Sequence, residues 1–159
     1  MAFIKTEMVS RMNILLENYF NIIHIEALTA LDIATKEIAP SIIKYQNFLL
    51  EEINNKTKIQ ESASKNEKHA KLSSALEMRL LEKISSLSEK FNDSLIALEK
   101  GLNTYSKIKT DLEKARHCKN VLLKDMDDLR TYADEIELHM AKEFHPFPTY
   151  EDILYSVKY

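Results

Sequence analysis

The chain contains a single glycine, Gly101, among its 159 residues. Proteins on average use glycine for about 7% of their residues. Tight turns between strands, hairpins and phosphate-binding loops depend on glycine, because glycine adopts positive φ angles without a steric cost. Only three prolines are present as further turn residues. The sequence therefore predicts an all-α protein, since it leaves almost no place for a β-sheet.

Length, charge and cysteine content narrow the class of protein further. A chain of this size predicts one domain, residues 1–159, with a real hydrophobic core. The net charge of −3 does not favour nucleic-acid binding. Cys118 has no second cysteine to pair with, which fits a reducing compartment. Neither a membrane-spanning run nor a signal-peptide pattern occurs, so we expect a cytoplasmic protein without nucleic-acid or membrane partners.

Apolar residues at three- and four-residue steps predict a first long helix near the N-terminus. Its stripe consists of Ile4, Met8, Met12, Leu15, Tyr19 and Ile22. The stripe then widens, so we expect 22–38 to be the most buried segment, with Ile25 and Leu28 in the core. Truncating Leu28 to alanine is then expected to cost roughly 2–5 kcal/mol. Pro40 lacks a backbone donor and predicts a kink, after which the helical pattern resumes.

Two further stripes predict two more long helices. The second runs from Leu72 to Leu102, after a polar stretch at 54–73 that is either solvated helix or loop. The third runs from Leu112 to Met140, and the T-x-x-E sequence at Thr110 predicts a capping box before it. Helices this long must pair lengthwise. We therefore predict a bundle of three long antiparallel helices, the first kinked at Pro40, plus a short C-terminal helix.

The sequence offers only poor candidates for a catalytic or metal-binding group of side chains. His24 and Glu26 are two residues apart, so a helix points them to different faces. His139 and Glu143 share a face, but such a pair is more often a surface interaction than a metal site. No glutamate is followed three residues later by histidine, which nearly excludes a di-iron four-helix protein.

The single cysteine also lacks the surroundings of a nucleophile. Cys118 follows His117 directly, so the two side chains point about 100° apart on a helix. A buried structural cysteine is therefore the favoured interpretation. The sequence contains no glycine-rich phosphate loop, serine elbow or Cys-x-x-Cys pair. We expect no catalytic, cofactor-binding or metal-binding residue in this chain.

The last sixteen residues hold five of the thirteen phenylalanines and tyrosines. Two prolines stiffen this segment, which lowers the entropy lost when it docks. The rings either pack back on the end of the bundle or anchor the chain to another surface, since aromatic residues are favoured interface anchors. The candidate docking residues are Phe144, Pro146, Phe147, Pro148, Tyr150 and Tyr155.

Four segments resemble a known family, the type III glutamine synthetases. Residues 144–157 are similar to its terminal "W-P-F-P-T-Y-G-D-L-L-F-S" signature, although His145 and Glu151 replace a tryptophan and a glycine. Residues 128–137 resemble its "LR…AD-ELE" stretch, and residues 16–32 its "LENY…IEALTMLDM" segment. Pro40 falls where the family has "ILPAVSKY". The resemblance spans nearly the whole chain.

The resemblance implies that this chain is the helical C-terminal region of a longer enzyme. The full-length parent would make glutamine from glutamate and ammonia, using ATP and Mg²⁺ or Mn²⁺, within a ring-based oligomer. The family's catalytic motifs lie upstream and are missing here, so the chain alone is expected to lack enzyme activity and to bind no cofactor. Met1 would start an expressed fragment or a gene for the domain alone.

The expected partners are the catalytic region of the parent chain and further copies in a homo-oligomer, with a role in packing or assembly. The alternative is a free-standing helical-bundle adaptor or dimerisation module. That alternative depends on the steps of four and three residues from Leu122 to Met140, which are typical of a coiled-coil seam.

Overall fold

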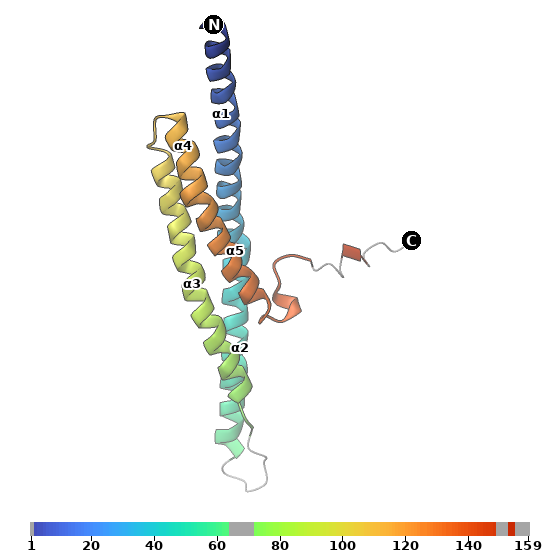
Figure 1. Cartoon of the computed structure of the whole chain (residues 1–159). Coiled ribbons are helices and arrows are strands. Elements are labelled where there is room, and N and C mark those ends of the chain that lie inside the picture. Colours follow the sequence, from blue (N-terminus) through green and yellow to red (C-terminus); the bar gives the residue numbers. More distant parts are fainter. Residues whose placement is uncertain (1, 64–71, 149–152, 155–159) are drawn as a thin grey trace. The chain divides into compact units, whose positions relative to one another are not determined.

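The computed structural model describes residues 2–63, 72–148 and 153–154, and this part of the chain contains helices and turns without a strand (Figure 1). The elements in chain order are α1 (Ala2–Ile33), the π-helical turn η1 (Ala34–Ile38), α2 (Ala39–Ala63), α3 (Ala75–Tyr105), α4 (Asp111–His117), the π-helical turn η2 (Cys118–Leu122), α5 (Leu123–Glu137) and the 3₁₀ turn η3 (Lys142–Phe144). The prediction of an all-α protein with three long helical stretches is confirmed. Of the short helix predicted at the C-terminus, only Ile153 and Leu154 are described, and both are helical.

None of the helices in the described part of the chain combines the length and the apolarity that a membrane span needs.

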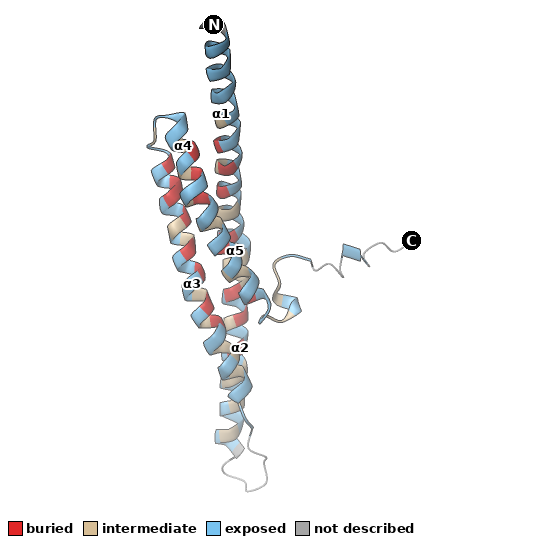
Figure 2. Ribbon diagram, in the orientation of Figure 1, coloured by how far each residue is buried: buried red, intermediate tan, exposed pale blue. Residues whose placement is uncertain are grey.

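The chain divides into two compact units. The first comprises Met1–Ala34 and Phe91–Tyr132, and the second comprises Thr35–Lys90 and Ala133–Tyr159. Each unit has buried apolar residues of its own, and the ribbon in Figure 2 is red at buried positions.

The core of the first unit forms where α1 contacts α4 and η2. Its buried side chains are Phe20, Ile23, Ala27, Ala34, Phe91, Leu98, Leu102, Tyr105, Ala115, Cys118, Leu122 and Leu129. The Sγ atom of Cys118 lies 3.8 Å from the carbonyl oxygen of Phe20. Burial raises the pKa of the Cys118 thiol, which keeps it protonated and unreactive. The interpretation of Cys118 as a buried structural cysteine is confirmed.

The core of the second unit joins one face of α2 to α3 and α5. Its buried side chains are Ile42, Tyr45, Leu49, Ile84, Leu87 and Ile136. A polar contact adds to this packing, because the amide of Gln46 lies 3.4 Å from the hydroxyls of Ser85 and Ser88. The second and third predicted stripes therefore supply core residues to one unit or the other.

The prediction for the first helix was wrong at its centre. Ile25 is 62% exposed and Leu28 is 47% exposed, so neither belongs to the core. The segment 22–38 is buried only at Ile23, Ala27 and Ala34, whose spacing places them on one side of the helix. The wide apolar surface misled the prediction, because a helix can be apolar all round and still be covered on one side. Leu28→Ala should therefore cost less than the roughly 2–5 kcal/mol expected for a fully buried leucine.

The helical irregularity predicted at Pro40 takes the form of the π-helical turn η1, which ends two residues before this proline. Proline has no N–H to donate to the carbonyl four residues earlier, here that of Lys36 within η1. A π-helical turn shifts the hydrogen-bond pattern by one residue and is a recognised cause of helix irregularity.

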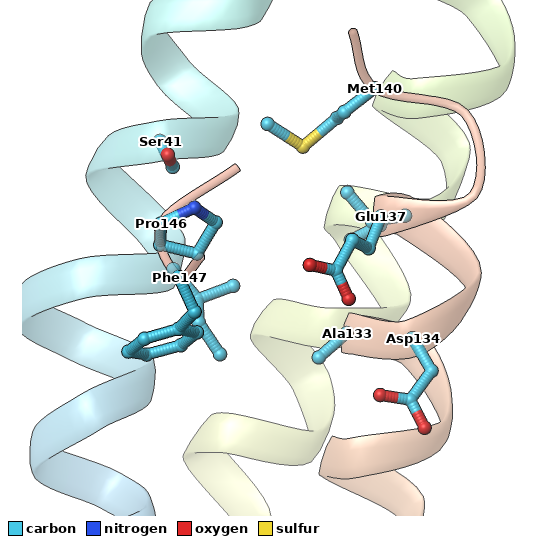
Figure 3. Close-up of a pocket in the computed structure, with 9 residues that line it drawn as sticks. Ser41, Ala133, Asp134, Glu137, Met140, Pro146 and Phe147 are labelled. Carbon is cyan, nitrogen blue, oxygen red and sulfur yellow. The ribbon is translucent and has the colours of Figure 1, made fainter. Parts of the chain in front are cut away.

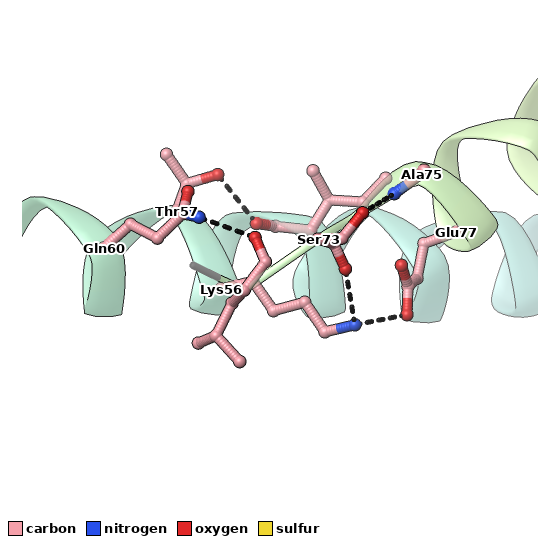
Figure 4. Close-up of polar contacts among 8 residues, drawn as sticks. Lys56, Thr57, Gln60, Ser73, Ala75 and Glu77 are labelled. Carbon is pink, nitrogen blue, oxygen red and sulfur yellow. Dashed lines mark hydrogen bonds and ion pairs between the residues drawn. The ribbon is translucent and has the colours of Figure 1, made fainter. Parts of the chain in front are cut away.

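The polar stretch at 54–73 is helical as far as Ala63. Lys56 holds the end of α2 to the start of α3, because its Nζ atom lies 2.5 Å from Oε1 of Glu77 and 3.4 Å from the carbonyl oxygen of Ser73 (Figure 4). This hydrogen bond from Lys56 lowers the pKa of Glu77. The side chain of Gln60 donates a 2.6 Å bond to the carbonyl of Leu72. Charged and polar side chains therefore join these two helices where apolar residues are scarce.

Helix α4 begins where the T-x-x-E sequence predicts, with Thr110 in an extended conformation just before Asp111. The hydrogen bonds of a capping box are not formed. The Thr110 hydroxyl instead donates a 2.6 Å hydrogen bond to Oε2 of Glu113. The prediction of the helix start is confirmed and the predicted cap is wrong.

Gly101 lies in α3 at a point of close contact with η2 and α5. A Cβ atom added there would lie 2.9 Å from Cδ2 of Leu122 and 3.0 Å from Oδ2 of Asp125. Its φ angle is not positive, so the position does not need glycine for backbone conformation. An added methyl group would meet the ends of the Leu122 and Asp125 side chains, so these side chains would have to shift to make room for it. Burial raises the pKa of the Asp125 carboxyl at this contact, and the nearby Asp128 adds to the effect.

A substitution tests this contact. Gly101→Ala is expected to lower the free energy of unfolding by about 1 kcal/mol, because overpacking costs about 1–3 kcal/mol and outweighs the helix propensity gained. Asn103→Ala, at an exposed position of the same helix, is the control and should leave stability unchanged or slightly raised. Urea unfolding measures both variants. A more stable Gly101→Ala protein would show that the contact is not tight.

A second contact in the first unit makes stability depend on pH. The ring of His24 stacks on Tyr105 with 4.3 Å between ring centroids. The ammonium group of Lys114 lies 5.1 Å from the ring of Phe20 and 5.8 Å from that of Tyr105. Burial, and secondly the charge of Lys114, lower the pKa of His24 below 6.5. The folded protein therefore favours neutral His24.

Because the unfolded chain binds a proton at His24 more readily, this group adds stability above pH 6.5 that is lost as the pH falls below it. His24→Phe keeps an aromatic ring on Tyr105 but cannot titrate. Its stability relative to wild type, measured by urea unfolding, should therefore rise as the pH is lowered from 7.5 to 5.5. The other histidines are common to both proteins and cancel in this difference. A difference that stays constant with pH would contradict the assignment.

Candidate docking site

The segment after α5 folds back on α2 through Phe144. The ring of Phe144 lies 5.2 Å from both Tyr45 and Phe48, measured between ring centroids, and is tilted against each of them. The hydroxyl of Ser41 donates a hydrogen bond to the carbonyl oxygen of Phe144. Burial raises the pKa of Tyr45 in this cluster. Phe144 therefore packs within its own chain.

His145 closes the turn that follows α5. One ring nitrogen, Nε2, lies 3.3 Å from the carbonyl oxygen of Met140. The other, Nδ1, is buried and lies 3.5 Å from Oε1 of Glu137, where a protonated ring would form an ion pair. His145 thus makes polar contacts near the end of α5 through both of its ring nitrogens.

Pro146 and Phe147 form one side of a cavity in the second unit (Figure 3). The cavity has a volume of about 110 Å³ and is lined by Ile38, Ser41, Ala133, Asp134, Ile136, Glu137, Met140, Pro146 and Phe147. Figure 3 shows Met140 reaching across the opening towards Ser41, and the carboxylate of Glu137 at its edge. Its volume is comparable with that of apolar cavities of about 150 Å³ that bind benzene. The cavity is therefore large enough to admit a small group, and Asp134 and Glu137 contribute carboxylates to its lining.

The six predicted docking residues have different positions. Phe144 and Pro146 are half-buried against their own chain, whereas Phe147 is 45% exposed and Pro148 is exposed. Tyr150 and Tyr155 lie outside the described residues. Two side chains of the described tail, Phe147 and Pro148, therefore face solvent, and the docking role of the segment stays a prediction.

Sequence reasoning missed the part of the site that comes from α2. Ser41 and Phe144 are 103 positions apart, and no pattern in the sequence links them. The aromatic pair Tyr45 and Phe48 was the available signal, because three-residue spacing places both rings on neighbouring positions of one helix face.

The combinations considered for chemistry are not brought together. Nε2 of His117 lies 2.8 Å from the carbonyl oxygen of Gly101, so this ring is engaged away from Cys118. His139 lies in the turn after α5 and Glu143 in η3, so they do not share a helix face. Within residues 2–63, 72–148 and 153–154, no group of three or more His, Cys, Asp or Glu side chains is placed to hold a metal ion.

Known proteins with similar sequences identify the family. The family model of the glutamine synthetase C-terminal domain matches residues 1–57. The chain is 31% identical over 156 residues to a glutamine synthetase of Butyrivibrio fibrisolvens, which covers 98% of this chain and 21% of that protein. It is 26% identical over 154 residues to a glutamine synthetase of Bacteroides fragilis strain YCH46, which covers 97% and 20%.

The chain thus spans about a fifth of the length of these relatives. No solved structure matches it. The alignments cover nearly the whole chain, and with it the four segments of the predicted resemblance. These matches support a glutamine synthetase C-terminal domain in this chain, because the family model covers residues 1–57 and the similarity to two glutamine synthetases extends over nearly the whole chain.

Proposed function

We propose that this chain is the non-catalytic C-terminal domain of a type III glutamine synthetase, and that it packs on the catalytic region and supports oligomer assembly. One observation carries the proposal: the alignments cover 97–98% of this chain but only a fifth of each relative. The other four fifths of such a protein leave ample room for a catalytic region. The tail at 144–157, with its F-P-T-Y sequence, supports the assignment to type III.

In this proposal the parent enzyme is a ligase that joins ammonia to glutamate with ATP and a divalent metal, Mg²⁺ or Mn²⁺. It acts in glutamine biosynthesis and nitrogen metabolism in the cytoplasm. ATP and metal would bind to the catalytic region, and no residue of this chain is assigned to either. The chain contributes helical packing surfaces, not reacting groups.

The alternative, a free-standing adaptor that dimerises through the seam from Leu122 to Met140, is less well supported. Leu122, Leu129 and Ile136 of this seam are buried within their own chain. A seam that already packs on its own units is not available for a second molecule. The adaptor reading therefore loses the observation on which it depended.

The purified 159-residue chain is expected to form no glutamine from glutamate, ammonia, ATP and Mg²⁺. A coupled assay of phosphate release together with direct detection of glutamine measures this. Full-length glutamine synthetase from Butyrivibrio fibrisolvens is the positive control. ATP-dependent glutamine formation by the chain alone would overturn the division of roles.

The tail is proposed to dock on the catalytic region through Phe147 and Pro148. The binding partner is a related glutamine synthetase that lacks the fifth matching this chain. Phe147→Ala should weaken binding of the chain to this partner by at least about tenfold, as expected for an aromatic anchor. Leu138→Ala is the matched control, because Leu138 is an exposed apolar residue outside the tail. Titration calorimetry measures both. Equal losses for the two variants would show that the tail is not the docking segment.

A further inference from the structure

Helix α1 carries a long apolar surface that its own unit leaves uncovered. The exposed side chains are Ile4, Met8, Met12, Leu15, Tyr19 and Ile22, which we call the α1 stripe. At 100° per residue, these six positions lie within about 80° of each other around the helix. The buried residues Ile23 and Ala27 lie to one side of this arc, about 20° and 60° beyond its edge. The stripe is therefore a second face, next to the one that packs in the core.

The stripe has the spacing of a coiled-coil seam. From Met8 to Ile22 its steps alternate between four and three residues, as a and d positions of a heptad do. Such a seam is complementary to another helix with the same pattern, because each side chain inserts between four residues of the facing helix. Its geometry therefore specifies a helical occupant.

Exposure of the stripe leaves the first part of α1 without support. Every side chain from residue 4 to residue 15 is exposed, and Figure 2 shows these turns in pale blue. Isolated helices shorter than about 12–15 residues are marginal in water, and their stability in proteins comes from packing of an apolar face. A helical segment with this many exposed apolar residues therefore needs a partner.

The charges on this segment favour a second copy of the same chain. Between residues 4 and 22, Lys5 and Arg11 balance Glu7 and Glu17. Arg11 and Glu7 already form an ion pair of 2.6 Å along the helix. None of the four charged positions falls within the arc of the stripe. Two copies would therefore meet without net repulsion and without burying a charged side chain.

We propose that the chain forms a two-fold symmetric dimer in which the α1 stripes of two copies pack on each other. A two-fold axis lets one self-complementary surface serve both copies, so each stripe covers the other. This dimer would give the proposed assembly role a specific contact, and only its biological setting rests on the proposed function. The dimer itself depends on this chain alone.

Sedimentation equilibrium of the 159-residue chain at about 100 μM is expected to give twice the monomer mass of 18.5 kDa. Leu15→Glu should weaken dimerisation at least about 100-fold, because it places an ion in the apolar contact. Ile14→Glu is the matched control. Ile14 is 55% exposed and Leu15 is 69% exposed, but Ile14 lies about 80° outside the stripe. The control should change the dimerisation constant by less than about threefold.

A cysteine variant tests the contact without adding a charge. Leu15→Cys, treated with a bis-maleimide cross-linker, should give a covalent dimer, whereas Ile14→Cys and the wild type, whose Cys118 is buried, should not. A monomeric wild type, or a dimer that Leu15→Glu does not weaken, overturns the proposal. If the monomer binds the catalytic region of a relative through α1, that region is the occupant and the proposed function stands. A dimer that fails to bind that region would support the dimer proposed here and contradict the proposed function.

Discussion

The contact of Gly101 in α3 with the side chains of Leu122 and Asp125 constrains the packing of the first unit. A single added methyl group would meet Leu122 and Asp125 at about 3 Å. This contact brings the fully buried Leu122 against α3, while the neighbouring Cys118 reaches the backbone of Phe20 in α1. The only glycine of the chain is therefore used to bring helices together, not to turn the backbone.

Helix α1 combines two different surfaces because of this packing. Phe20, Ile23 and Ala27 face α4 and η2, while Met8 and Leu15 remain exposed. Burial of one face stabilises only the second half of the helix. The first half has the apolar content of a core element but lacks a partner in its own unit. Its uncovered apolar face is the basis of the proposed role in assembly.

The sequence predicted the helical class and the apolar faces of the second and third stripes, because periodicity reports which residues share a face. Ile84 and Leu98 lie within the second stripe and Leu122 within the third, and all three are buried. Periodicity does not report whether a face meets its own chain or another one, and so Ile25 and Leu28 were wrongly assigned to the core. Long-range contacts such as that between Ser41 and Phe144 leave no local pattern. The contact of Gly101 with Leu122 and Asp125 likewise joins residues more than twenty positions apart, so no local pattern reveals it.

The tail likewise combines contacts within its own chain with exposed side chains. The aromatic and proline content of 144–148 indicated a docking segment, and Phe144 does dock, on Tyr45 and Phe48 of its own α2. Phe147 remains exposed at the edge of a cavity. Composition thus identified the segment, while the division between inner and outer contacts depended on the arrangement of α2 and the turn after α5.

Hydrogen–deuterium exchange along α1 at two protein concentrations tests the central claim most directly, namely that one half of this helix is held by its own unit and the other half by a second copy. At a concentration well below the dimerisation constant, amides of residues 4–15 should exchange rapidly while those of residues 20–34 remain protected. At high concentration both segments should be protected. Equal protection of the two halves at every concentration, or rapid exchange of residues 4–15 in the concentrated protein, would contradict the account.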